Sequence, residues 1–137
     1  MRAFHHSLAI LIFIACKAPD DAAVVSCENH PLSTNGLMTC RLEAKRVSQS
    51  TSAPFSTESR NELVHVKGQL SLATGSAKVE LHGTRGVVQT LTLTAGQAVT
   101  LDADVPVVRA SRSFRIAFTP LSTDATGLSG TVEHFAR

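Results

Sequence analysis

The sequence predicts an all-β protein: an antiparallel β-sandwich of about eight short strands, with an immunoglobulin-like or jelly-roll topology. Apolar and polar residues alternate through most of the chain from residue 24 onward. This alternation is typical of strands with one buried and one solvated face. Turn-forming clusters such as Thr74-Gly75-Ser76 interrupt it roughly every dozen residues. Beyond the N-terminal segment, no window repeats apolar residues at helical spacing.

The first element is an N-terminal segment with the layout of a secretory leader over residues 1–15. Arg2 precedes an apolar run at residues 8–15, and Lys17 and Asp20 follow it closely. This run is short, because a membrane-spanning helix needs about 20 apolar residues. We therefore expect a helical signal peptide that is removed, and not a retained membrane span.

The residues at the end of this leader carry a family resemblance. Ile14, Ala15 and Cys16 resemble the lipobox of bacterial lipoproteins, with Phe13 where that family usually has leucine. The resemblance covers residues 1–16 alone. It implies that Cys16 is lipidated and becomes the first mature residue, so that two or three acyl chains (palmitate-type) anchor the protein to a membrane. Lys17, in a place where aspartate favours the inner membrane, implies the outer membrane in a cell that has one. A conventional cut would instead give a secreted or periplasmic protein.

The cysteine count supports this interpretation. The chain has 3 cysteines, and an odd count in an exported protein calls for an explanation. Lipidation of Cys16 leaves Cys27 and Cys40 as a pair, and an oxidising compartment favours a disulfide between them. Both lie on strand-like runs beside apolar neighbours, so we expect both side chains to point inward. A pair of free thiols stays open, whereas the spacing argues against a metal site.

A short tether at residues 16–23 is expected to lead into a single domain at residues 24–137. Its first strand covers residues 24–27, and its second alternates over residues 37–47 with Cys40, Leu42 and Ala44 inward. Seven of the 14 residues at positions 48–61 are Ser or Thr, which predicts a flexible loop. Ser59 and Glu62 have capping-box spacing, but no helical apolar period follows them.

Six further segments complete the expected sandwich. The first four alternate around turns, and Pro106 ends the fourth. Their expected inward residues are Val64, Val66, Leu70 and Leu72; Ala77, Val79 and Leu81; Val87, Leu91 and Leu93; and Val99, Leu101, Ala103 and Val105. A strand with Phe114, Ile116 and Phe118 inward follows, then a loop at residues 120–127 and a last strand at residues 128–135.

Histidines and aspartates are the candidates for chemistry. His65 and His82 alternate with apolar residues, so both should face solvent, and two of His65, His82 and His134 could meet across strands to bind zinc or copper. Asp102 and Asp104 form an outward D-x-D pair. We expect solvated surface groups, with no metal and no cofactor, in every case.

Two other uses of the acidic pair stay open. Asp102 and Asp104 could join Asp124 in binding calcium, but they do not fill a shell of six to eight oxygens. They could also act as acid and base in glycoside cleavage. Ser129, in Gly127-Leu-Ser-Gly130, lies outside any nucleophile elbow. None of these patterns predicts an enzyme.

Composition narrows the partners. The 137 residues have a net charge of +2 and are 43% hydrophobic, with six Phe and no Trp or Tyr. Arg109 and Arg115 share an outward face, but no basic stripe suited to nucleic acid is present. We therefore expect a non-enzymatic accessory or interaction module of the cell envelope, with a possible protein partner there. The alternative is a small-ligand module for carbohydrate or a metal ion.

Overall fold

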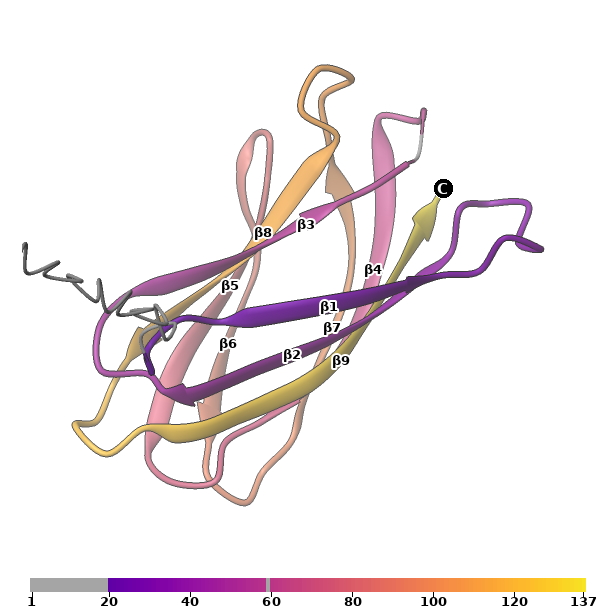
Figure 1. The fold of residues 1–137 in the computed structure, drawn as a ribbon. Coiled ribbons are helices and arrows are strands. Elements are labelled where there is room, and N and C mark those ends of the chain that lie inside the picture. Colours follow the sequence, from indigo (N-terminus) through magenta and orange to yellow (C-terminus); the bar gives the residue numbers. More distant parts are fainter. Residues whose placement is uncertain (1–19, 59) are drawn as a thin grey trace, which may run out of the picture.

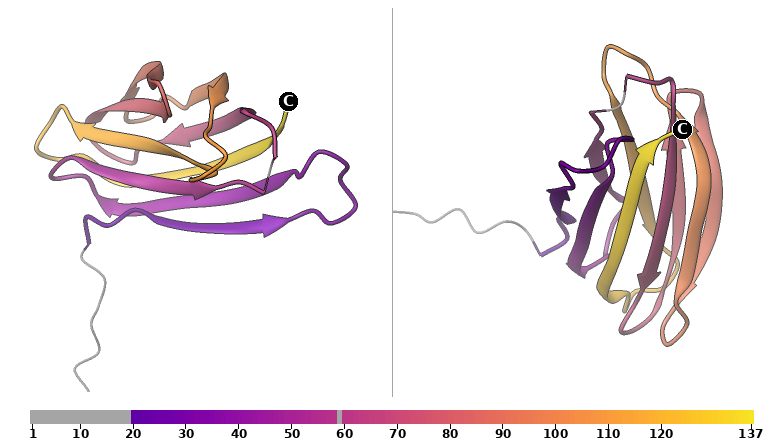
Figure 2. Two further views of the ribbon diagram at one scale, coloured as in Figure 1. Left: turned by 90° about the horizontal axis from the view of Figure 1, so that it is seen from above. Right: turned by 90° about the vertical axis from the view of Figure 1, so that its right-hand side faces the viewer.

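Residues 20–58 and 60–137 are described by this computed structural model, and they form nine strands and no helix (Figure 1). In chain order the strands are β1 (Val24–Asn29), β2 (Met38–Arg46), β3 (Thr51–Ser56), β4 (Leu63–Ser71), β5 (Ser76–Gly83), β6 (Gly86–Thr94), β7 (Val99–Pro106), β8 (Ser113–Pro120) and β9 (Thr126–Ala136). They lie in two antiparallel sheets, ordered β1-β2-β9-β4-β7 and β3-β8-β5-β6, which face each other (Figure 2). The predicted antiparallel sandwich is confirmed.

The strand pairing is nested, and this decides the topology. β5 pairs with β6, β4 with β7, β3 with β8 and β2 with β9, always antiparallel. Such pairing is that of one long hairpin, with its tip at residues 83–86, that has rolled up into two sheets. This is the jelly-roll arrangement, so of the two expected topologies the jelly roll is the one observed. β1 is an additional edge strand on β2.

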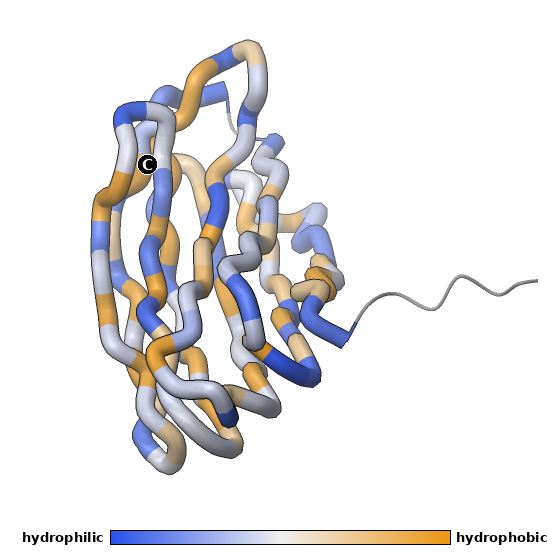
Figure 3. Tube along the Cα trace, turned by 90° about the vertical axis from the view of Figure 1, so that its left-hand side faces the viewer, coloured by the Kyte–Doolittle hydropathy of each residue, from blue (hydrophilic) through white to orange (hydrophobic). Residues whose placement is uncertain are grey.

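The core fills the space between the two sheets. The alternation of hydropathy along the strands is visible in Figure 3, and the inward faces of the central strands are fully buried as predicted. Phe55 and Phe114 stack within it, with ring centroids 5.0 Å apart. Buried residues that the alternation identified include Leu42, Val64, Val66, Leu70, Val79, Leu81, Leu101, Ile116 and Phe118.

The expected flexible loop at residues 48–61 is wrong in its centre. Thr51–Ser56 forms β3, which pairs with β8 at the edge of the four-stranded sheet. Ala53 and Phe55 are buried there. Pro54 is tolerated because β3 is an edge strand, and threonine favours strands. The polar composition of this segment therefore hid an amphipathic strand.

One inward residue was also assigned wrongly. Val87 was expected inside, but it is exposed. The register of β5 against β6 shifts at Leu81 and His82, which pair with Gln89 and Val87. A bulge of this kind inserts one residue, so the parity before it no longer predicts the face.

The N-terminal expectations lie mostly outside the described residues. The leader, Cys16 and the first part of the tether belong to residues 1–19. From residue 20 the chain contacts the domain: the backbone N–H of Arg46 donates to the carbonyl of Asp20 at 3.2 Å, and Lys45 forms an ion pair with the same aspartate at 3.6 Å. Within the described part of the chain, no helix has the length and hydropathy that a membrane crossing requires.

Candidate functional site

Cys27 and Cys40 are joined by a disulfide, as predicted. They lie directly opposite each other in the register of β1 and β2, with Cα atoms 4.0 Å apart. Cys40 is fully buried, but Cys27 is exposed, so the expectation that both thiols point into the core is wrong for Cys27. The reason is its strand, because five of the six residues of the edge strand β1 are exposed.

His65 and the D-x-D pair form a polar cluster that we call the His65 cluster: His65, Asp102, Asp104 and Arg137. Nδ1 of His65 lies 2.6 Å from Asp104, and Nε2 lies 3.1 Å from Asp102. Nε of Arg137 lies 3.4 Å from the second oxygen of Asp104. His65 does point away from the core, but it is only 7% exposed, because its neighbours cover it. The expectation of a solvated histidine is therefore wrong.

The geometry of this cluster favours a structural network. Both ring nitrogens of His65 face a carboxylate, so neither is free to accept a proton from a nucleophile. Within residues 20–58 and 60–137, no serine, threonine or cysteine is among the hydrogen-bond partners of His65. A nucleophile–histidine pair of the hydrolase type is therefore not formed at this histidine.

The structure separates the three aspartates considered for calcium. Asp102 and Asp104 both lie on the outer face of β7, as predicted, but Asp124 precedes β9, near the pairing of Thr74 with Thr126. Asp104 pairs with His65, at the opposite end of β4. The described residues hold no group of three or more His, Cys, Asp or Glu side chains that could bind a metal ion.

The other two histidines lie elsewhere. His82 is on β5, in the four-stranded sheet. His134 points into the core, where its ring meets Phe55 and Phe114 edge-on and Nε2 lies 3.8 Å from the sulfur of Cys40. Desolvation by burial lowers the pKa of His134 to about 4. This neutral, buried ring is a part of the core and not a surface ligand.

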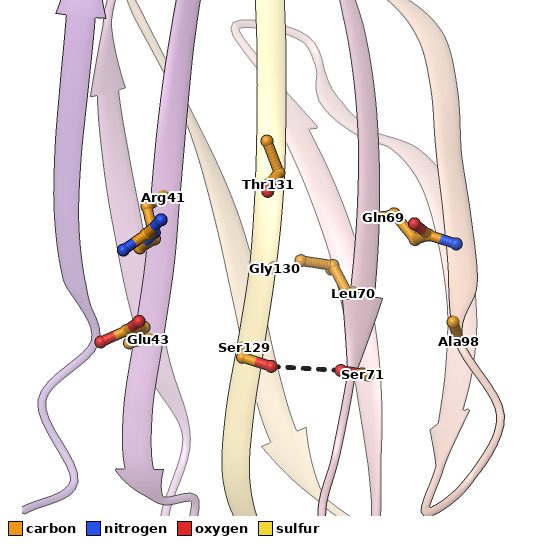
Figure 4. Close-up of a pocket in the computed structure, with 9 residues that line it drawn as sticks. All are labelled: Arg41, Glu43, Gln69, Leu70, Ser71, Ala98, Ser129, Gly130 and Thr131. Atoms are coloured by element: carbon orange, nitrogen blue, oxygen red, sulfur yellow. Dashed lines mark hydrogen bonds between the residues drawn. The ribbon is translucent and has the colours of Figure 1, made fainter.

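The outer face of the five-stranded sheet carries a polar hollow of about 370 Å³, which we call the polar hollow (Figure 4). Arg41 and Glu43 of β2 stand on one side, and Gln69 of β4 stands on the other. Thr131, and Ser129 with its hydrogen bond to Ser71 at 3.1 Å, lie between them. Strand parity places all of these side chains on the solvent face, because their neighbours Leu42, Leu70 and Val132 are buried.

Two features set the character of this hollow. Arg41 and Glu43 form no ion pair within the described parts of the chain, so both are available to a ligand. A second hollow of about 320 Å³ shares Arg41 and Thr131 and continues to Ser26 and Glu28 of β1.

Reasoning from the sequence missed this site. Arg41 and Glu43 were expected to face outward, and they do, but the residues opposite them come from β9 and β4, more than twenty residues away along the chain. No periodicity reveals which distant strands become neighbours. Ser129 and Thr131 alternate with apolar residues and lie opposite Ser71 and Gln69, but the sequence did not show that these residues share a face with Arg41 and Glu43.

Comparison with known proteins gives weak structural likenesses. No family model and no curated protein matches the chain. Among the solved structures that resemble it is a Bacillus endospore appendage described as a disulfide-linked pilus (12% identity, 96% of this chain and 98% of that chain, TM-score 0.48). Another is a cupin domain of an XRE-family transcriptional regulator from Enterobacter cloacae (13% identity, 85% of this chain and 99% of that chain, TM-score 0.40). A further one is a CBM22 xylan-binding domain from Paenibacillus barcinonensis (12% identity, 85% of this chain and 87% of that chain, TM-score 0.44). These similarities assign no function to the chain, so its function is proposed from the geometry of the site.

Proposed function

We propose that this chain is a lipid-anchored, non-enzymatic binding module of the bacterial cell envelope, and that its ligand binds in the polar hollow. Acyl chains on Cys16 would hold the domain at a membrane, since each buried CH₂ contributes about 0.8 kcal/mol and two or three chains anchor stably. The Cys27–Cys40 disulfide is compatible with a location outside the cytoplasm. The short tether would keep the domain close to the outer membrane.

The observation that carries the proposed binding is the set of side chains around the polar hollow. Arg41 supplies only donors, Glu43 supplies only acceptors, and Gln69 supplies both. Hydroxyl groups of Ser129 and Thr131 complete the lining. A ligand that both donates and accepts hydrogen bonds at closely spaced points suits this mixture best.

Such a ligand is rich in hydroxyl groups, and envelope carbohydrate is the class that we propose. The hollow has no aromatic residue in its lining, so the sugar would be held by hydrogen bonds and not by stacking. The adjoining hollow, which shares Arg41 and Thr131, continues the polar surface toward β1. This favours an extended chain of several sugar units over a single small molecule.

The separation of the two polar regions supports a role without catalysis. His65 and Gln69 share the outer face of β4 four residues apart, or about 13 Å along the strand. The paired His and Asp groups therefore do not line the polar hollow. A bound sugar would meet a guanidinium, a carboxylate, an amide and hydroxyls, but no acid–base pair of the His65 cluster.

Binding of purified, detergent-solubilised full-length protein to immobilised envelope oligosaccharides tests this proposal. We expect Arg41→Gln to weaken binding about tenfold or more, since a hydrogen bond to a charged group contributes about 1.5–3 kcal/mol. Arg46→Gln is the matched control, because Arg46 ends the same strand outside the hollow. Equal effects of the two variants, or no binding to any oligosaccharide at millimolar concentration, would contradict the proposal.

A further inference from the structure

A third hollow, of about 460 Å³, lies on the other sheet and is independent of the proposed carbohydrate site. It lies at the end of the four-stranded sheet, between the β5–β6 turn at residues 83–86 and the loop that joins β7 to β8. Its volume falls within the range of small-molecule pockets, about 300–1,000 Å³. We call it the Arg115 pocket, after the side chain that defines its charge.

Arg115 gives this pocket an unpaired positive charge. Within residues 20–58 and 60–137, no carboxylate lies within ion-pair distance of its guanidinium, and no Asp or Glu lines the pocket. His82 stands opposite Arg115 in the β5–β8 register. Its shielded Nε2 lacks a hydrogen-bond partner in the same part of the chain, and the nearest carboxylate oxygen, on Glu80, lies 3.7 Å away.

The rest of the lining divides into hydroxyls and apolar surface. Ser111 and Ser113 have no hydrogen-bond partner for their side chains among the described residues, so both hydroxyls can donate to a ligand. Pro54, which lies opposite Arg115 in the β3–β8 register, and the exposed Val108 supply apolar walls. An inorganic anion would leave these walls unused, whereas a carboxylate with an apolar body would use both parts.

Hydrogen bonds fix both sides of the pocket before any ligand arrives. In the loop, the N–H of Arg112 donates to the carbonyl of Val108 at 2.9 Å, and the carbonyl of Arg112 accepts from Thr57 at 2.8 Å. Arg112 has φ = 44°, a left-handed conformation that is costly for a residue other than glycine and is frequent at binding sites. The opposite wall is held by Thr84, whose N–H donates to the carbonyl of Pro106 at 2.9 Å.

Glycine is required at one point of that wall. A Cβ on Gly83 would lie 2.7 Å from the carbonyl oxygen of Pro106 and 2.9 Å from Val105. The absence of a side chain therefore lets the β5–β6 turn approach the end of β7, which fixes the position of the turn residues Gly83, Thr84 and Gly86 that line the pocket. Preorganised walls of this kind reduce the ordering cost of binding.

We infer that the Arg115 pocket binds a small organic carboxylate, with the carboxylate on Arg115, Ser111 and Ser113 and the apolar body against Pro54 and Val108. The planar guanidinium matches a carboxylate with two parallel hydrogen bonds. This site faces away from the polar hollow and needs neither carbohydrate nor the lipid anchor.

Titration of the full-length, detergent-solubilised protein with benzoate and hexanoate, followed by NMR, tests this inference. The neutral analogues benzamide and hexanamide and inorganic phosphate are the comparison ligands. We expect both carboxylates to shift the resonances of Val108, Ser111 and Ser113, and to bind about tenfold or more tightly than their amides, because only the carboxylates pair with the guanidinium.

Substitutions show which side chain causes the preference for carboxylates over amides. Arg115→Gln should remove the preference for carboxylate over amide, and Ser111→Ala should weaken it severalfold. Arg109→Gln, in the same loop but outside the pocket, should leave it within twofold of the unmodified protein. The inference is overturned if acids and amides bind alike or not at all, if phosphate binds as well as benzoate, or if Arg109→Gln matches Arg115→Gln.

Discussion

His134 is a single residue whose burial couples the stability of the whole domain to pH. Its ring is fully buried, and desolvation lowers the pKa to about 4 from 6.5. The unfolded chain therefore binds a proton between these two values that the folded chain excludes. Above pH 6.5 the ring is neutral in both states, and its full contribution to the free energy of unfolding is present. As the pH falls toward 4, the unfolded chain gains a proton that the folded chain excludes, and this contribution is lost. The loss amounts to about 3 kcal/mol over that interval.

We expect His134→Leu to flatten the dependence of the unfolding free energy on pH between 6.5 and 4. Urea unfolding at several pH values measures this slope. His30→Leu is the control, because His30 is exposed and its replacement should leave the slope unchanged. An equal acid sensitivity in His134→Leu and the unmodified protein would refute the assignment.

Alanine substitutions at two glycines of the same backbone conformation distinguish the cost of a left-handed backbone from the cost of a steric clash. Gly75 and Gly96 have φ of 76° and 78°. A Cβ on Gly96 meets nothing within 4 Å, whereas a Cβ on Gly75 would lie 2.7 Å from backbone atoms of Ala125. Gly96→Ala should cost about 1 kcal/mol for the left-handed conformation alone, and Gly75→Ala should cost at least about 1 kcal/mol more. Similar unfolding free energies in the two variants would rule out the crowding at Gly75.

Among the elements, β3 shows how far composition can mislead. The Ser- and Thr-rich segment at residues 48–61 predicted a flexible loop, because its polar residues outnumber its apolar ones. Two inward residues, Ala53 and Phe55, suffice to make six of its residues a strand. Stronger alternation made β4, β5 and β8 predictable, since each presents three or more apolar residues to one face.

Phe55→Ala tests whether β3 belongs to the core. Phe55 is 1% exposed and stacks on Phe114, so its truncation should lower the unfolding free energy by about 3–5 kcal/mol. Ser56→Ala, at an exposed position of the same strand, should change it by no more than about 0.5 kcal/mol. Denaturant unfolding distinguishes this from a mobile segment, in which neither substitution would matter.

At the scale of the whole molecule, the sequence predicted a β-sandwich but not the order in which its strands pair. Alternation fixes which side chains are buried, yet it contains no information on which strands pair, so immunoglobulin-like and jelly-roll topologies remained equivalent. The polar hollow and the His65 cluster both depend on that pairing, because each draws residues from strands distant in the chain. The disulfide was predictable without the strand pairing, because the prediction needed only the cysteine count and an oxidising compartment.

The disulfide has a mechanical consequence if Cys16 is the anchor. β1 follows the tether directly, and it is a largely exposed edge strand. The Cys27–Cys40 bond joins it covalently to the buried face of β2. A pull from the membrane would therefore reach the core through the disulfide and not through the hydrogen bonds of β1 alone. Closing this loop also stabilises the fold by roughly 3 kcal/mol in the chain-entropy model.

Intact-mass spectrometry of the protein, extracted from the membranes of its native cell without reductant, tests the central proposal most directly. We predict a chain that begins at Cys16, carries the mass of two or three acyl groups, and gains two hydrogens when the Cys27–Cys40 bond is reduced. An unacylated chain that begins at another residue, or one in which Cys27 and Cys40 are both free, would contradict it.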